Sequence, residues 1–175
     1  PSIKLNWRGE PLLNPKLEEF ITYAKKKGIL EVSINTNAVS LTEKRAKKLI
    51  KSGLDIIIFS FDGGSKQTYE KMRPGRFKRN NFDSVYENIK KFSEIKKEMK
   101  AKFPITKIQM ILTKDSKNEK ENFFKLFSNI LDDVTVTQYN ERGGSINDLT
   151  DNERKKIKNY LEQNNLDINS PYMVN

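Results

Sequence analysis

Short apolar runs alternate along the chain with longer segments in which apolar residues recur every three or four positions. The short runs predict five β-strands, over residues 3–7, 30–36, 55–61, 105–113 and 134–139. The longer segments predict helices over residues 15–27, 42–53, 65–72, 82–102, 118–131 and 150–163. Pro15 in a first turn, Thr42 as an N-cap, and Gly28 and Gly53 as stop residues mark helix ends.

The regular order of strand and helix predicts an α/β fold with a parallel sheet and helical crossovers. Two architectures fit this order, an open doubly wound sheet and part of a (β/α) barrel. We expect one domain over residues 1–175, with its core in 3–145 and a further helix at 150–163. The run at 55–61 is apolar at successive positions, which predicts a strand covered on both faces.

Composition narrows the chemistry, because the 175 residues contain no cysteine and no histidine. Disulfides, thiolate metal sites and a histidine base are therefore excluded within this chain. Pro1 enters directly into a strand-like run, which indicates a piece of a longer protein. No apolar run approaches the ~20 residues that a membrane helix needs, and no signal-like segment opens the chain, so we expect a cytoplasmic protein with no membrane partner.

The net charge of +10 could indicate an RNA or a phosphate-bearing partner. Most lysines lie beside glutamates on predicted helical faces, so a solvated surface is the preferred interpretation and nucleic-acid binding the weaker one. The segment "KMRPGRFKR" at 71–79 has five basic residues and no acid. It fits either an anionic partner or a solvated loop.

Polar and glycine-rich segments follow each predicted strand. They read "RGEP" (8–11), "NTNA" (35–38), "SFDGG" (60–64), "TKDSKNE" (113–119) and "NERGG" (140–144). Because parallel strands end at one edge of a sheet, where ligands of α/β proteins bind, the five segments together predict a ligand site. Each segment taken alone fits an ordinary turn equally well.

Individual side chains in these segments suggest what such a ligand carries. Glu10 could accept a hydrogen bond from a cationic amine. Ser60 and Asp62 alternate with Phe59 and Phe61, so they are expected on the opposite face of the strand, where they suit a ribose diol. Arg73 and Arg142 offer paired donors to a carboxylate or phosphate, unless they lie free in solvent.

The order of a strand with "GEP", a strand with "NTN" and a strand with "SFDG", followed by an arginine about a dozen residues later, resembles the core of radical SAM enzymes. The segment "GLDIIIFSFDGGSKQTYEKMRPGRFKRNNFDSVYENIKKF" resembles the subgroup with a cysteine-rich C-terminal extension, the SPASM or twitch proteins. The resemblance covers about residues 3–145. It implies a partial (β/α)6 barrel in which the five strands are the second through the sixth.

The resemblance also implies cofactor-binding residues. Gly9, Glu10 and Pro11 match the glycine-glycine-glutamate-proline motif, which receives the amino group of S-adenosylmethionine. Ser60 and Arg73 match residues that hold its ribose and carboxylate, and Asp62 matches the aspartate beside that serine. The other matched positions lie at strand ends near the cofactor or substrate: Thr36, Asn37, Thr113, Asn118 and Arg142.

Two departures from the family pattern accompany the match. Arg8 replaces the first glycine of the motif, and the CxxxCxxC loop that holds a 4Fe-4S cluster is absent from the chain. The resemblance therefore implies cluster cysteines outside these residues, and a fragment that is inactive alone.

The resemblance implies that the intact enzyme cleaves S-adenosylmethionine reductively, with an electron donor, to form a 5'-deoxyadenosyl radical that takes a hydrogen from a peptide or small metabolite. The alternative is a barrel without a cluster that serves as a binding or assembly module for a peptide or RNA.

Overall fold

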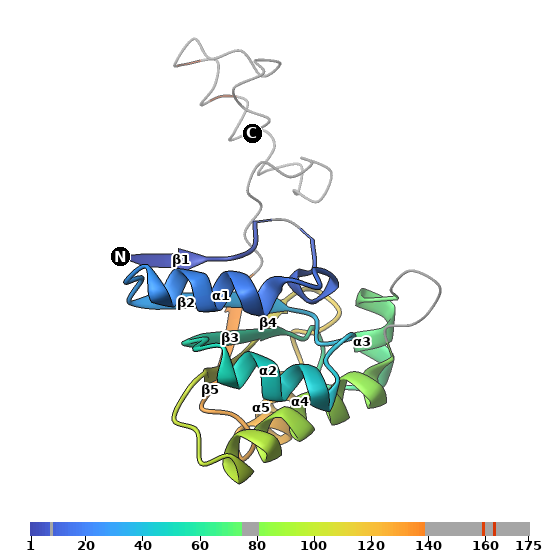
Figure 1. Cartoon of the computed structure of the whole chain (residues 1–175). Coiled ribbons are helices and arrows are strands. Elements are labelled where there is room, and N and C mark those ends of the chain that lie inside the picture. Colours follow the sequence, from blue (N-terminus) through green and yellow to red (C-terminus); the bar gives the residue numbers. More distant parts are fainter. Residues whose placement is uncertain (8, 75–80, 139–158, 160–162, 164–175) are drawn as a thin grey trace. The chain divides into compact units, whose positions relative to one another are not determined.

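Five parallel strands form the sheet of this chain in a computed structural model that describes residues 1–7, 9–74, 81–138, 159 and 163. The strands are β1 (Ser2–Lys4), β2 (Glu31–Thr36), β3 (Ile56–Ser60), β4 (Ile105–Leu112) and β5 (Asp133–Gln138). The helices are η1 (Pro11–Leu13), α1 (Leu17–Lys26), α2 (Glu43–Lys51), α3 (Lys66–Met72), α4 (Phe82–Glu98) and α5 (Lys120–Phe127), as Figure 1 shows. The predicted α/β fold with a parallel, barrel-like sheet is confirmed.

The strands lie in the order β1-β2-β3-β4-β5, which is also their order in the sequence, and the described strands do not close into a barrel. The register pairs Thr36 with Phe59 on the neighbouring strand, and Ser60 with Gln109 on the next. Asn37 and Ser60 are the residues that directly follow the Thr36–Phe59 pair. The polar ends of β2 and β3 therefore lie side by side at one edge of the sheet.

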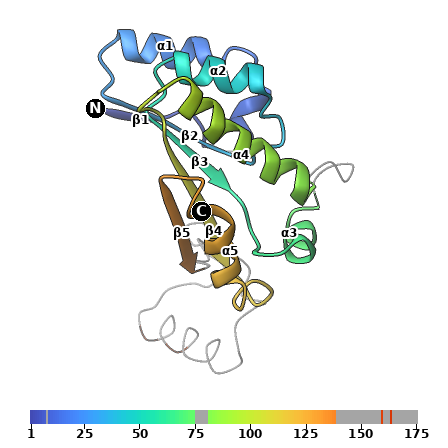
Figure 2. The ribbon, with the colours of Figure 1, turned by 90° about the horizontal axis from the view of Figure 1, so that it is seen from below.

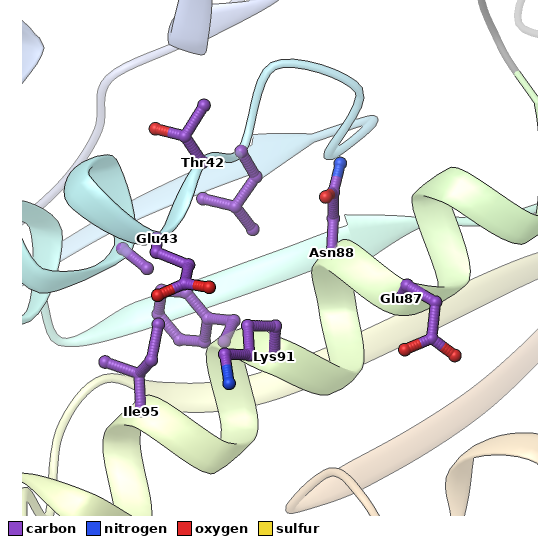
Figure 3. Close-up of a pocket in the computed structure, with 9 residues that line it drawn as sticks. Thr42, Glu43, Glu87, Asn88, Lys91 and Ile95 are labelled. Atoms are coloured by element: carbon purple, nitrogen blue, oxygen red, sulfur yellow. The ribbon is translucent and has the colours of Figure 1, made fainter.

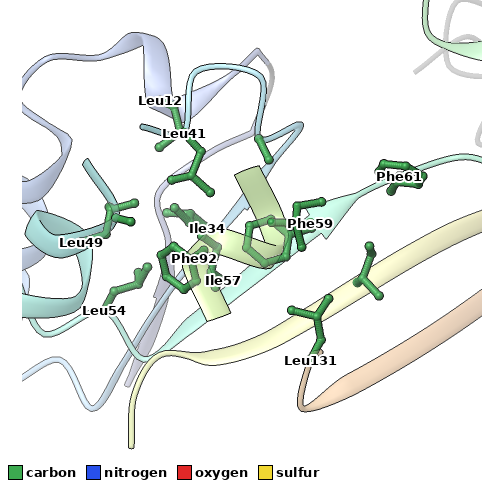
Figure 4. Packing of buried hydrophobic residues seen from close by; sticks show 14 of the residues in the cluster. Leu12, Ile34, Leu41, Leu49, Leu54, Ile57, Phe59, Phe61, Phe92 and Leu131 are labelled. Carbon is green, nitrogen blue, oxygen red and sulfur yellow. The ribbon is translucent and has the colours of Figure 1, made fainter. Parts of the chain in front are cut away.

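Helices cover one face of the sheet and form the core with it. Figure 2 shows α2 next to α4, both on the same side of β2 and β3. The alternate strand residues Ile34, Ile57 and Phe59 are fully buried on this face, and Phe92 of α4 packs edge-on against Phe59 (Figure 4). The apolar residues predicted for the core side of α4 are buried: Val85, Ile89, Phe92 and Ile95.

The opposite face of the sheet is only half-buried in the part of the chain that the structure describes. On β3, Ile56 and Ile58 are only half-buried, whereas Ile57 and Phe59 between and beyond them are buried. The prediction that both faces of β3 are covered is therefore wrong for these residues. Most other side chains on this open face are polar: Ser33, Asn35, Ser60, Lys107, Gln109, Asp133, Thr135 and Thr137.

Strand β1 is shorter than the predicted strand at 3–7, and the reason is local. Leu5 N–H still donates to Ser33 O at 3.0 Å, but at the next position the Asn6 side chain, not its backbone, accepts from Asn35 N–H at 2.8 Å. A side chain thus replaces the backbone ladder, and the strand ends. Trp7 beyond it is 89% exposed.

Carboxylates fix the amino ends of two strands. Asp55 accepts from Val32 N–H at 2.7 Å and pairs with Lys25 at 2.8 Å. Asp132 accepts from the N–H and the hydroxyl of Thr106, both at 2.7 Å, and from Lys96 at 2.6 Å. Burial favours the neutral form of Asp132, but these donors outweigh it and lower its pKa. Each aspartate therefore ties its strand to the neighbouring one.

The chain divides into two compact units, Pro1–Gln138 and Tyr139–Asn175. The predicted helix at 150–163 falls in the second unit and outside the described residues, apart from the isolated positions 159 and 163, so a single domain over 1–175 stays a prediction. No helix in the described ranges is long and apolar enough to cross a membrane.

Candidate functional site

The Glu10 carboxylate joins the ends of β1 and β2. Its Oε1 accepts from Leu12 N–H at 3.0 Å and from the buried Thr36 hydroxyl at 2.6 Å, and its Oε2 accepts from Asn37 N–H at 2.8 Å. A carboxylate offers about four acceptor positions. Three are filled by the protein, which leaves Oε2 able to accept one further donor.

Backbone geometry explains why the "GEP" residues occur in this order. Gly9 has φ +82°, a left-handed conformation that side chains with a Cβ rarely adopt. Glu10 is the N-cap of η1, and Pro11 occupies the first position of that turn, where no N–H is needed. Arg8 lies outside the described residues.

Arg45 of α2 holds the turn that carries Glu10. Its guanidinium donates to Leu12 O at 2.8 Å and to Asn14 O, and pairs with Glu18 at 2.7 Å. Hydrogen bonds thus stabilise the turn at two places, from Leu12 N–H to Glu10 inside the turn and from Arg45 of α2 to the Leu12 and Asn14 carbonyls.

Ser60, Asp62 and Arg73 meet at the end of β3. The half-buried Ser60 hydroxyl makes no hydrogen bond to any described residue. Asp62, 8% exposed, accepts from Arg73 Nε at 2.7 Å, and Arg73 Nη2 lies 2.6 Å from the same oxygen. The other Asp62 oxygen accepts from Ile111 N–H of β4 at 3.0 Å. Arg73 itself is the C-cap of α3, held by its N–H on Tyr69 O at 2.8 Å.

Two glycines let the loop after β3 pass close to its neighbours. A Cβ on Gly63 would lie 2.7 Å from Tyr69 N, and one on Gly64 would lie 2.4 Å from Glu119 O. Real Cβ atoms do not approach backbone so closely. The pair in "SFDGG" is therefore required by packing as well as by the turn.

Glu119 is the residue that this loop packs against, and the sequence did not single it out. Its carboxylate accepts from Gly64 N–H at 2.7 Å and from the hydroxyls of Ser65 and Thr68 at 2.6 and 2.7 Å. Burial by itself raises the pKa of Glu119, but these hydrogen bonds stabilise the charged form, so that its pKa lies below the ordinary value.

Thr113 lies at the end of β4 and contacts the same region. Its hydroxyl lies 3.6 Å from the sulfur of Met72, the residue before Arg73. Its N–H donates to Ser116 at 2.9 Å, which folds the following turn. Asn118, by contrast, is exposed and its side chain makes no hydrogen bond among the described residues. Arg142 lies outside the described residues.

Asn35 is a second residue that the sequence did not single out as a site residue. It lies on the open face of β2, opposite Ile58, and its side-chain oxygen is buried without a hydrogen-bond partner. Its position one residue before Thr36 in "NTNA" was the available signal.

A pocket of about 270 Å³ lies between α2 and α4, and Figure 3 shows the side chains that line it, among them Thr42, Glu43, Asn88 and Lys91. None of the predicted site residues lines it. We place the candidate site at the strand ends, because the unpaired donors and acceptors lie there and this pocket is formed by the helix layer.

Metal-binding residues do not gather in the described part of the chain, where no three His, Cys, Asp or Glu side chains could hold an ion. The full sequence also has no cysteine. An iron–sulfur cluster needs thiolates, so the residues present do not fit one.

Curated sequences similar to this chain include a "Probable GTP 3',8-cyclase" of Methanococcus maripaludis, 39% identical over 87 residues. That match covers 50% of this chain and 28% of the relative. A "GTP 3',8-cyclase" of a Synechococcus species is 37% identical over 67 residues, 37% of this chain and 19% of the relative. The chain thus spans less than a third of the length of these relatives.

Solved structures with the same fold include Streptococcus suis SuiB bound to S-adenosylmethionine, with a TM-score of 0.61 and 20% identity over 95% of this chain and 36% of that one. Another is anSMEcpe with bound AdoMet, with a TM-score of 0.62 and 20% identity over 93% of this chain and 45% of that one. The model of the radical SAM superfamily matches residues 8–127. The chain therefore belongs to the radical SAM superfamily.

Proposed function

We propose that this chain is the central barrel segment of a radical SAM enzyme of the SPASM or twitch subgroup, and that its strand ends bind S-adenosylmethionine. The observation that carries this proposal is a pair of unfilled, oppositely charged groups at one edge of the sheet. Glu10 can accept one more donor, and Arg73 keeps N–H groups without an acceptor among the described residues. These suit the ammonium and carboxylate of an amino acid.

Ser60 completes the set of cofactor contacts that we propose. Its hydroxyl has no partner among described residues and follows the register pair at the edge between β2 and β3. A ribose hydroxyl would pair with it. Thr36 and Asn37 would act through Glu10, since both donate to its carboxylate. Thr113 would support Arg73 through the neighbouring Met72. Asn118 and Arg142 stay proposals from the family match alone.

The chemistry of such a reaction comes from the cofactor, which supplies hydrogen-atom abstraction when bound and reduced. The residues of this chain would bind its amino-acid part and orient its ribose. The cluster and an electron donor would be provided from outside these 175 residues.

The substrate is a peptide or a small metabolite. SuiB is known with its precursor peptide SuiA and anSMEcpe with a Cp18Cys peptide, whereas the sequence relatives carry the name of a GTP cyclase. The two groups of similar proteins thus support different substrate classes.

The test is the affinity of the full-length protein for S-adenosylmethionine, measured by calorimetry without oxygen. Glu10→Gln should weaken binding about tenfold, because a charged hydrogen bond is lost. Glu19→Gln on the exposed side of α1 is the matched control and should leave affinity unchanged. Equal affinity of Glu10→Gln and wild type would contradict the proposal. RNA binding that falls steeply with salt, without cofactor binding, would favour the cluster-less binding module.

A further inference from the structure

Asp62 and Arg73 are more closely linked to each other than to any other part of the candidate site. Arg73 Nε and Nη2 both approach one oxygen of Asp62, at 2.7 and 2.6 Å. This contact uses one edge of the guanidinium. The other edge, formed by Nη1 and the second Nη2 hydrogen, has no acceptor among the described residues.

The remaining oxygen of Asp62 fixes the direction of this contact. It accepts from Ile111 N–H of β4 at 3.0 Å, so the carboxylate is anchored to the sheet itself. The Asp62 side chain is 11% exposed and that of Arg73 25% exposed. Both oxygens of Asp62 are thus engaged by the protein, and the carboxylate is nearly buried, whereas the arginine still reaches solvent.

The backbone around Arg73 gives the guanidinium a defined starting point. Arg73 caps α3, with its N–H on Tyr69 O at 2.8 Å, and Pro74 follows and prevents a further helical turn. A long arginine side chain on such a cap would sample many rotamers without a fixed partner. Asp62 supplies that partner.

We infer that Asp62 is a positioning residue, which does not touch the ligand and holds Arg73 so that the free edge of its guanidinium meets a ligand carboxylate. The inference rests on the proposed function, because the ligand carboxylate is that of the cofactor's amino-acid part. The sequence pattern predicts that Asp62 contacts the ligand directly. The inference instead gives Asp62 the role of orienting Arg73, which makes the contact.

The experiment compares two unreactive probes on the full-length protein by calorimetry. S-adenosylhomocysteine carries the amino-acid carboxylate, and 5'-methylthioadenosine lacks it. Asp62→Asn should weaken binding of S-adenosylhomocysteine about tenfold, because the guanidinium loses its fixed orientation. It should leave binding of 5'-methylthioadenosine unchanged. Asp115→Asn, which breaks the exposed Lys71–Asp115 pair, is the matched control and should change neither affinity.

A double-mutant cycle separates positioning from a general loss of structure. Arg73→Ala should weaken binding of S-adenosylhomocysteine about thirtyfold, and adding Asp62→Asn should weaken it no further. Arg73→Lys keeps the positive charge beside Asp62 but lacks the paired N–H donors of the guanidinium. It should weaken binding of S-adenosylhomocysteine about tenfold and leave binding of 5'-methylthioadenosine unchanged.

Several results would overturn the inference. They are an equal loss for both probes in Asp62→Asn, an effect of Asp62→Asn that persists with Ala at position 73, and an Arg73→Lys variant as tight as wild type. If Arg73→Ala weakens S-adenosylhomocysteine and Asp62→Asn does not, the inference fails and the proposed function stands. If the wild type binds neither probe, both fail.

Discussion

The Thr36 hydroxyl donates to Glu10 Oε1 at 2.6 Å and at the same time accepts from Ala38 N–H at 3.0 Å. Through this one buried group the end of β2 is joined both to the turn after β1 and to its own following loop. Ala38 adopts φ +58°, so the loop needs such a contact to hold it.

Thr36→Val removes both hydrogen bonds and keeps the side-chain shape. We expect a loss of about 2 kcal/mol in the free energy of unfolding, because a buried N–H and a carboxylate oxygen each lose a partner. Urea denaturation of the full-length protein measures it. Thr22→Val, which loses only a 3.4 Å contact to Ser52 O, is the control and should cost about 0.5 kcal/mol or less. Equal losses for the two variants would contradict this role of Thr36.

Glu119 should make stability depend on pH in the acid range. Burial opposes its charge, but hydrogen bonds from Ser65, Thr68 and Gly64 lower the pKa in the folded state. A group with a lowered folded pKa stabilises the protein above its unfolded pKa of about 4.3 and loses that contribution as pH falls through the folded value.

Glu119→Gln should therefore cost about 2 kcal/mol in the free energy of unfolding at pH 7, and the difference from wild type should shrink as pH falls through the acid range. Urea denaturation at a series of pH values checks this. The exposed Glu121→Gln is the control and should follow wild type at every pH. A difference that stays constant from pH 7 to pH 3 would show that the charge of Glu119 is not involved.

Gly64→Ala and Gly28→Ala should distinguish two reasons why a position requires glycine, namely close approach of a neighbouring backbone and a positive φ angle. At Gly64 the new Cβ would lie 2.4 Å from Glu119 O, and we expect a loss of about 3 kcal/mol from this overlap. At Gly28 there is open space and φ is +81°, so only backbone strain of about 1 kcal/mol is expected. Thermal unfolding of both variants decides whether close approach is the stronger constraint. A milder effect at Gly64 would contradict it.

Arg45→Ala should loosen the turn that carries Glu10. Three acceptors lose a charged donor, namely Leu12 O, Asn14 O and the Glu18 carboxylate, and we expect a loss of about 2 kcal/mol in the free energy of unfolding. The neighbouring exposed Lys44→Ala is the control. An Arg45→Ala protein as stable as the control would mean that Glu10 alone holds the turn.

Four of the five strands were predictable to within about one residue at each end, because runs of apolar residues report burial directly, whereas the first ends at Lys4 and not at Trp7. The ends of the helices were less predictable than the ends of most strands. The helix expected over 82–102 ends at Glu98, where Lys100 takes φ +50° and Ala101 N–H closes onto Lys96 O at 3.1 Å. This ending is usually marked by glycine, and the lysine gives no such signal.

The candidate site was predictable as a set of strand ends but not as a set of contacts. The sequence predicted Glu10 and Arg73 in segments that follow strands, and both residues lie in such segments in the structure. It could not show that Asp62 holds Arg73 and a β4 N–H, or that Glu119 binds a loop more than fifty residues earlier, because both relationships depend on crossings of segments far apart in the chain. Local pattern carries no information on such crossings.

The polar open face of the sheet has a consequence for the evolution of this chain. Among the described residues, side chains such as Ser60, Gln109 and Thr135 lie outside the apolar core, which forms between the sheet and the helices. Replacing them would alter the polar groups that this face offers to a ligand and would remove little apolar surface from the core. Under the proposed function, descendants of one scaffold would therefore change their ligand contacts by single substitutions on this face, without compensating mutations in the core.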